Sequence, residues 1–342
     1  MDLNIIFKSK NKYYRPEEDM LNKIYFLVPS AALRIILILL TALFYSTGSQ
    51  AQGCSDAGFC TMGAMRPNQH YSSNAQVQFR SVEFSQYIGY TKFHDVILNY
   101  TIDANVSIGK KNTVQVKLPY QLVYGALANT RGTGDISLSF TRNILAKRNY
   151  QVNASLGTKI PTMNSDLKTD DGRPLPGYYQ TSLGTYDFIA GISFLTKNWL
   201  IATGYQQALN HNGNEFVWAA WTGSDKETKA REYPIGKDLL RGKDIMLRVE
   251  RNFRSSKFNA YVGLLGIYRI TRDQVFDPAT KLVLPKDGTT GLALTALGGV
   301  GYNISVKTTI KGMFGQRLVQ RDINPDGLSR EWVQTISVEY KF

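Results

Sequence analysis

The chain has 342 residues, with 40 Lys and Arg against 27 Asp and Glu, a net charge of +13, two Cys and three His. A mean hydropathy of −0.23 excludes a protein of many membrane-spanning helices, since each span needs ~20 successive apolar residues. The 12% of aromatic residues supply apolar surface for a folded core. Two Cys cannot frame a disulfide-rich scaffold, and three His argue against a metal site of several imidazoles.

The first element along the chain is a short apolar run at 35–45, with basic residues before it and small residues after it. This order is typical of a secretory signal peptide cut after Ala51. An uncleaved anchor helix is the alternative, but the run is shorter than the ~20 residues of a span. Residues 1–19 include acidic side chains, which signal peptides avoid, so we expect Met20 to be the natural start. Residues 1–51 are thus predicted to be an N-terminal extension plus a signal peptide.

Residues 52–75 form a predicted periplasmic segment that contains Cys54 and Cys60. An exported protein meets an oxidising compartment, which favours a disulfide between these two residues. A lipid anchor on Cys54 is an alternative, although acylated cysteines usually have Leu three residues earlier, where this chain has Ala51. A metal site that includes His70 is a further alternative, but it lacks a second Cys pair.

From residue 76 onward, apolar and polar residues alternate with a period of two, which predicts β-strands with one apolar face. The first strand changes phase between Phe79 and Val82, as at a β-bulge. We predict about twelve strands, near residues 77–89, 92–106, 113–122, 134–145, 150–161, 185–196, 199–209, 243–253, 258–270, 291–302, 305–317 and 332–342.

The connections between these strands alternate between short and long. The short ones fall near 109–112, 146–149, 197–198, 254–257 and 303–304, and the long ones near 123–133, 162–184, 210–241, 271–289 and 319–330. A soluble sandwich has no reason to sort its loops in this way, whereas outer-membrane barrels have short periplasmic turns and long outer loops. We therefore predict an all-β fold over 76–342, a transmembrane antiparallel up-and-down β-barrel with both termini in the periplasm.

Aromatic residues lie near the ends of the predicted strands, where two girdles would meet the lipid headgroups. The alternative is that Tyr and Trp are simply favourable strand residues. The set comprises Tyr120, Tyr150, Tyr186, Trp199, Tyr205, Tyr302, Tyr340 and Phe342. The terminal aromatic residue of an alternating strand also resembles the C-terminal signature read by the machinery that assembles bacterial outer-membrane barrels. Outer-membrane lipid and that machinery are the partners we expect.

Three glycine-containing blocks in the middle of the chain resemble a known family, the outer-membrane barrels grouped as the phenol-degradation "MetA-pathway" family. The blocks are 118–120 with Gly125 and 132–140, then 157–162, and then 182–188 running on to Trp199 and 204–205. That family is distantly related to the long-chain fatty acid transporter class. The resemblance covers roughly residues 113–342 and implies passage of small hydrophobic or aromatic molecules. No ligand residue of the family carries over.

The same blocks have an architectural interpretation. Long loops are expected to re-enter strands at Gly134-Asp135 and at Leu183-Gly184, where Gly permits positive φ and Asp caps backbone donors. Pro119 and Pro161 fall near strand ends, where a missing N–H costs least. We therefore read these motifs first as parts of a barrel rim, and as ligand contacts second.

The sequence shows no motif for catalysis. It has no Gly-x-Ser-x-Gly elbow, no Gly-x-x-x-x-Gly-Lys loop and no His-Glu-x-x-His. His94 and His211 have no Ser at a recognisable spacing, and the acidic residues between 166 and 171 do not match a calcium loop. We predict neither enzyme activity nor a cofactor, with an outer-membrane hydrolase as a minor alternative.

The polar faces of the predicted strands point into the lumen. The candidate lumen-lining residues are Gln115, Lys117, Gln151, Asn153, Lys159, Arg248, Glu250, Asn259, Lys307, Lys311, Thr335 and Glu339. Cations outnumber anions in this set, which predicts a mild preference for anions in a passively conducting lumen. The alternative is that the charges pair across a filled lumen, because a barrel of about twelve strands is narrow.

The long loop at 210–241 contains an aromatic cluster. Its candidate ligand or gate residues are Phe216, Trp218, Trp221 and Tyr233. Such a cluster either folds inward as a lid that contacts an apolar solute, or packs over the mouth of the barrel.

Together these features predict an exported protein of a Gram-negative outer membrane that passes small molecules passively or under control of its loops. The alternative is a non-conducting barrel that displays its loops to a partner or forms a subunit of an envelope complex. The basic residues are spread over strands and loops rather than clustered, which favours an anionic membrane surface and gives no case for nucleic acid.

Overall fold

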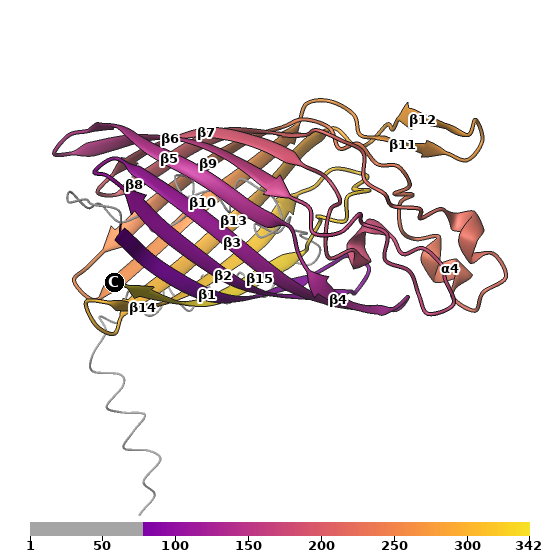
Figure 1. Cartoon of the computed structure of the whole chain (residues 1–342), viewed down its shortest axis with the longest axis horizontal. Coiled ribbons are helices and arrows are strands. Elements are labelled where there is room, and N and C mark those ends of the chain that lie inside the picture. Colours follow the sequence, from indigo (N-terminus) through magenta and orange to yellow (C-terminus); the bar gives the residue numbers. More distant parts are fainter. Residues whose placement is uncertain (1–77) are drawn as a thin grey trace, which may run out of the picture. The chain divides into compact units, whose positions relative to one another are not determined.

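The computed structural model describes residues 78–342, and the predictions for the signal peptide, Met20, Cys54 and Cys60 lie outside this range. These residues form a closed antiparallel β-barrel (Figure 1). Its wall is made of β1 (Gln78–Tyr90), β2 (Val96–Ile108), β3 (Asn112–Tyr124), β5 (Ile136–Ala146), β6 (Tyr150–Ile160), β7 (Asp187–Thr196), β8 (Trp199–Ala208), β9 (Asp244–Arg254), β10 (Phe258–Arg269), β13 (Gly291–Asn303), β14 (Thr308–Val319) and β15 (Trp332–Lys341). The predicted all-β barrel is confirmed.

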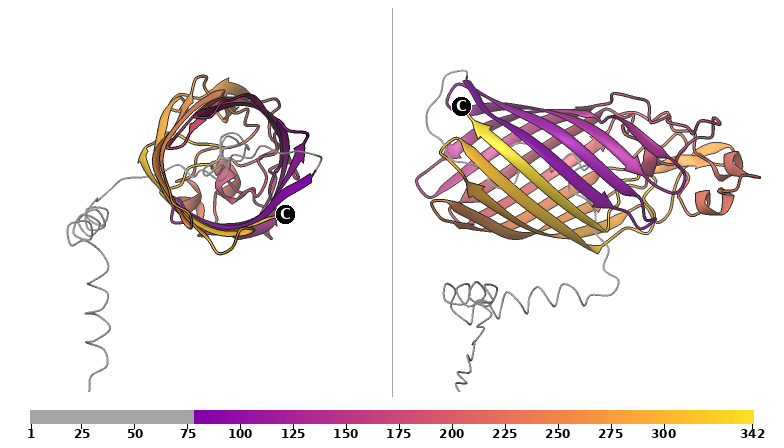
Figure 2. Two further views of the ribbon diagram at one scale, coloured as in Figure 1. Left: turned by 90° about the vertical axis from the view of Figure 1, so that its left-hand side faces the viewer. Right: turned by 90° about the horizontal axis from the view of Figure 1, so that it is seen from below.

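The barrel closes because β1 pairs with β2 on one side and with β15 on the other. Figure 2 shows the resulting ring along its axis. The short strand β4 (Asn129–Thr133) pairs with the loop-side half of β3 and adds a thirteenth strand to the sheet. The register of β1 against β2 shifts between Phe79 and Ser81, at the site of the predicted bulge.

The wall faces lipid with apolar side chains, and from β14 through β1 to β6 it faces the lumen with mainly polar ones, the inverse of a soluble protein. In β2 the exposed Ile102 lies between the buried Thr101 and Asp103, and in β15 the exposed Ile336 and Val338 flank the buried Ser337. Transmembrane barrels show this alternation because their outer surface must be apolar.

The two ends of the barrel differ. Short turns at 109–111, 147–149, 197–198, 255–257 and 304–307 form the end where the C-terminus lies, which we call the turn end (Figures 1 and 2). Long connections at 125–135 (which contains β4), 161–186, 209–243, 270–290 and 320–331 form the loop end, together with the short 91–95 segment. The predicted segregation of short and long connections is therefore confirmed.

The loops carry little regular structure of their own. They contain η2 (Gly177–Tyr179), η3 (Trp218–Trp221), α4 (Glu227–Ala230) and a hairpin of β11 (Gln274–Asp277) with β12 (Leu282–Pro285). Within residues 78–342, no helix is long and apolar enough to cross a membrane.

Aromatic side chains gather on the outer surface near both ends. At the turn end Phe79 and Phe342 lie 6.1 Å apart between ring centroids, and Phe258 and Tyr302 lie 5.4 Å apart. At the loop end Tyr90 stacks on Trp332 at 6.0 Å. Of the predicted girdle residues, the turn-end group is Tyr150, Trp199, Tyr302, Tyr340 and Phe342, and the loop-side group is Tyr120, Tyr186 and Tyr205.

The lumen is asymmetric. On the side of β7 to β10 and β13, inward apolar side chains pack into one buried cluster, which includes Ile189, Met246, Tyr261, Leu265 and Leu297. The opposite side, from β14 round through β1 to β6, presents mainly hydroxyl, amide and charged groups. The open space of the lumen therefore lies against the polar side.

Candidate functional site in the lumen and the loop cap

The charged side chains of the lumen are paired. Lys311, on β14, places its Nζ 2.8 Å from Glu339 on the adjacent β15 and 3.0 Å from Glu83 on β1, the next strand beyond β15. Arg248 contacts Glu250 on the same strand. Buried charges are stable only when an opposite charge or hydrogen bonds compensate their desolvation. Each of these pairs therefore reduces the net field inside the barrel.

A larger ionic cluster surrounds Arg269 at the loop end of β10. Its guanidinium lies 2.8 Å from Asp244, 2.8 Å from Asp273 and 3.1 Å from Asp326. Arg321 adds a second positive charge, 3.7 Å from Asp326. Since Asp273 and Asp326 come from different loops, this cluster joins two long connections to the barrel wall.

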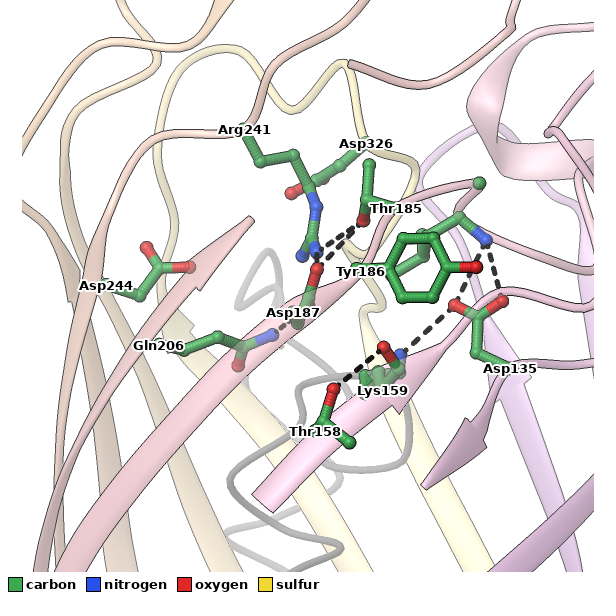
Figure 3. A network of polar contacts seen from close by, with 12 residues as sticks. Asp135, Thr158, Lys159, Thr185, Tyr186, Asp187, Gln206, Arg241, Asp244 and Asp326 are labelled. Carbon is green, nitrogen blue, oxygen red and sulfur yellow. Dashed lines mark hydrogen bonds and ion pairs between the residues drawn. The ribbon is translucent and has the colours of Figure 1, made fainter. Parts of the chain in front are cut away.

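A second ionic contact lies beside it, on β7 (Figure 3). Arg241, from the end of the 209–243 loop, contacts Asp187. The same carboxylate accepts hydrogen bonds from Thr185 at 2.8 Å and from Gln206 at 2.5 Å. The loop is thus tied to β7, the wall neighbour of the strand β8 from which the loop starts.

Asp135 holds the corner where the 161–186 loop meets the wall (Figure 3). It accepts hydrogen bonds from the Ser182 hydroxyl at 2.6 Å and from the Leu183 backbone N–H at 3.1 Å, and Lys159 lies 3.5 Å away. Gly184 follows with φ of 70°, and an added Cβ would lie 2.6 Å from the Asn164 carbonyl oxygen. Asp135 therefore accepts hydrogen bonds from backbone donors as expected, but those donors belong to the neighbouring 161–186 loop.

The loops share a buried aromatic core over the mouth of the barrel, which we call the loop cap. Its members are Tyr87, Phe93, Ile97, Val123, Leu127, Leu175, Tyr178, Tyr179, Phe216, Trp221, Ala230, Tyr233 and Val333. The rings of Phe93 and Tyr233 lie 4.3 Å apart between centroids, and Phe93 meets Tyr178 edge-on at 4.9 Å. Such packing is the reason that loops of this length hold one arrangement.

A buried carboxylate, Asp95, lies at the centre of the loop cap. It accepts hydrogen bonds from the hydroxyls of Tyr179 at 2.7 Å, Tyr233 at 2.9 Å and Thr91 at 3.1 Å. The Tyr179 hydroxyl in turn accepts one from the Leu127 N–H at 3.1 Å. Asp95 therefore joins the 91–95 segment to two long loops and to the connection that follows β3.

The two tyrosines remain donors to Asp95 over the physiological pH range. Burial raises the pKa of Tyr179 and of Tyr233 above the ordinary value, and the negative charge of Asp95 raises both further. Gly125 makes this close packing possible, since an added Cβ would lie 2.2 Å from both the Asp95 carboxylate and the Tyr179 hydroxyl. Gly125 belongs to the blocks on which the family resemblance depends.

Below the loop cap lies a cavity of about 160 Å³. Its walls come from β1, β2, β3, β5, β6, β14 and β15, with Arg248 and Tyr261 from the opposite side, and its ceiling from 177–183 and 326–330. Most of the residues that line it have polar side chains, but Pro119, Leu183, Met313 and Leu328 add apolar surface. The lining includes the ion pairs of Lys159 and Lys311.

The structure directs the predicted lumen residues inward, except for Lys307. Gln115 bonds to Asp103 at 2.6 Å, and Gln151 bonds to Asn153 at 2.7 Å. Lys307 lies in the turn before β14, because that strand begins at Thr308, and its amine lies over the ring of the outward-facing Tyr340. It is therefore not a lumen residue.

Sequence reasoning missed several inward carboxylates, which change the balance of charge. They are Glu83, Asp103, Asp187 and Asp244. Asp103 and Asp187 occupy polar positions in the period-two alternation of the sequence. The alternation therefore contained the information needed to predict that these two residues face the lumen. With these four acids included and Lys307 excluded, the set has four cations against six anions, so the excess of positive charge that the sequence suggested is absent.

The aromatic residues predicted as a ligand contact or gate lie mainly inside the loop cap. Phe216 and Tyr233 are fully buried and Trp221 is 2% exposed. Trp218 is 38% exposed and donates its indole N–H to the Tyr233 carbonyl oxygen at 2.8 Å. Their placement matches packing over the mouth of the barrel, the second of the two alternatives.

The chain matches no family model and no curated protein. Among solved structures, an outer membrane channel from Pseudomonas putida F1 superimposes with a TM-score of 0.51 at 12% identity, covering 80% of this chain and 100% of that one. The NanC porin gives 0.43 at 10% identity, covering 77% and 100%. At these identities the likeness shows the fold alone. The fold is that of an outer-membrane β-barrel.

Proposed function

We propose that the protein is a channel of a Gram-negative outer membrane, which passes small molecules through its lumen by facilitated diffusion. The observation that carries this proposal is the contrast between an apolar outer surface and a polar lumen that contains a cavity. Outer-membrane lipid, the barrel-assembly machinery and a small solute are the partners in this proposal, and export by a signal peptide is part of it.

The loop cap would control access from the loop end. Its loops are joined to one another through Asp95 and to the wall through Arg269 and Arg241. A solute that enters from this end must pass between these loops, so their opening would limit the rate. Since no family model matches the chain, passage of hydrophobic or aromatic molecules stays an expectation from the MetA-pathway resemblance.

The test is the ion current of the mature chain in a planar lipid bilayer. We expect discrete conductance steps, and the Ser337→Trp variant should reduce them because Ser337 lines the cavity. The matched control is Val338→Trp, since the next residue along β15 faces lipid. A wild-type protein that inserts as a folded barrel, carries no current and admits no uncharged solute in liposome swelling would overturn the proposal.

A second candidate is a non-conducting barrel that presents its loops to a partner. The observation in its favour is the loop cap itself, whose aromatic core lies over the mouth of the barrel. The two candidates differ in the Asp95→Ala variant. A channel with a loosened cap should conduct more than the wild type, whereas a barrel that serves only to display its loops should conduct in neither form.

A further inference from the structure

The lining of the cavity is rich in neutral hydrogen-bonding groups. Asn99, Thr101, Gln121, Gln180 and Ser337 are all buried and all line it. Some are held in place by each other: Gln121 donates to the Gln180 carbonyl oxygen at 3.1 Å, and Thr101 donates to Asn99 at 3.2 Å. The amides of Asn99 and Gln121 have more donor and acceptor positions than these bonds use, so the wall can bind further polar groups. The side-chain amide of Gln180 is already bonded to the backbone of Leu167 and Leu175, so Gln180 offers the cavity its backbone.

Several charged groups of the cavity have opposite charges beside them. Lys311 is matched by Glu83, Lys159 by Asp135, and Asp326 by Arg269. An ion of either sign that enters would lose its hydration and meet both an attractive and a repulsive charge at each position. The lining therefore gives an ion little net stabilisation to replace its water.

An apolar solute is also a poor match for this wall. The large apolar side chains of the lumen pack against one another on the side of β7 to β10 and β13, and the aromatic residues of the long loops are buried in the loop cap. An apolar molecule in the cavity would leave the amide and hydroxyl groups without partners, at a cost of about 1–3 kcal/mol for each buried group.

We infer that this cavity is a binding site for a neutral, polyhydroxylated solute of the size of a monosaccharide. Such a solute carries donors and acceptors on all sides, which is what a wall of alternating amides and hydroxyls can satisfy. A neutral solute also avoids the free-energy cost of moving a charged group out of water. This inference rests on the proposed channel function for its physiological meaning, but the site itself is testable by binding alone.

The experiment compares four probes on the folded mature chain: glucose, gluconate and glucosamine, which are similar in size, and phenol, a smaller aromatic molecule. Saturation-transfer NMR in detergent reports binding, and swelling of proteoliposomes reports entry of the uncharged probes. We expect glucose to bind more tightly than gluconate, glucosamine or phenol. The Thr101→Val and Gln121→Leu variants should each weaken glucose binding by about fivefold, the loss of about one hydrogen bond. Ile102→Val, on the lipid-facing side of β2, is the matched control.

The possible results separate the two proposals. Glucose binding without ion current or swelling would support the site and overturn the channel. Ion current with tighter binding of gluconate, glucosamine or phenol than of glucose would support the channel and overturn the site. The inference is also overturned if Thr101→Val and Gln121→Leu bind glucose as the wild type does while both remain folded barrels.

Discussion

The barrel wall and the loop cap are stabilised in different ways. In the wall, the outer surface is apolar and the inner charges form ion pairs between strands, as Lys311 does with Glu83 and Glu339. In the loop cap, aromatic side chains form a core of their own around Asp95, as in a small soluble domain. Lipid determines the pattern of the wall, whereas packing against other loops determines that of the cap.

Because of this difference, we expect that substitutions can alter solute access through the cap without altering formation of the barrel. The two regions meet through apolar packing of the cap on the wall residues Tyr87, Ile97, Val123 and Val333, and through ionic contacts at the loop end, above all those of Arg269. Variants in the core of the cap should change conductance and exposure of the loops while the strands stay paired. Variants of the contacts between the wall and the cap should change both the exposure of the loops and the stability of the barrel.

The largest effect is expected from Arg269→Met. The substitution leaves three carboxylates without their shared positive charge, and removal of one partner from a buried ionic cluster costs about 3–5 kcal/mol. The loss of stability is measured by unfolding in urea, with the folded fraction monitored by the heat-dependent gel mobility of the barrel. Arg272→Met is the control, since Arg272 is 57% exposed in its pair with Asp287. Equal losses in both variants would contradict the role of the cluster.

A smaller and more local effect is expected from Asp95→Ala. Two tyrosine hydroxyls lose their acceptor, at a cost of about 1–3 kcal/mol for each group left unsatisfied. Proteolysis within 161–186 and 209–243 should accelerate and conductance should rise, while the urea midpoint of the wall changes little. The exposed Asp225→Ala serves as the control. A drop in wall stability without faster loop cleavage would show that the two regions are not separable.

Acid should loosen the contact between cap and wall at Asp326. Burial alone would raise the pKa of this carboxyl, but the positive charges of Arg269, Arg321 and Arg241 outweigh it and hold the pKa below the ordinary 3.8. A folded-state pKa below the unfolded one gives stability that is present above pH 3.8 and lost as the pH falls through the folded value. Loop proteolysis by an acid protease between pH 5 and 2 should increase, and the increase should be smaller in Asp326→Asn.

The smallest effect is expected at the aromatic girdle of the wall. Trp199 lies under the guanidinium of Arg251, 5.0 Å from ring centroid to guanidinium carbon. Cation–π contacts at exposed sites contribute about 0.5–1 kcal/mol. Trp199→Leu should lower the stability of the refolded barrel in lipid vesicles by that amount and leave loop proteolysis unchanged. Faster proteolysis would mean that the turn end and the cap are coupled.

Much of the wall could be predicted from the sequence because its signals are local. Period-two alternation, the phase change near Phe79 and the order of short and long connections each depend on neighbouring residues. The same local reading misplaced Lys307, since it extended the alternation of β14 back into the preceding turn. Where a strand begins depends on its partner strands, which the local pattern does not contain.

The sequence by itself thus determined that residues 78–342 form an all-β barrel and that its short turns and long loops alternate along the chain. Only the tertiary structure decided how the lumen and the cap are completed. Lys311 and Glu83 are 228 positions apart, and Asp95 and Tyr233 are 138 apart. The physical reason is that a side chain's exposure follows from its own strand, whereas its ionic or hydrogen-bonding partner follows from closure of the barrel and from the packing of distant loops.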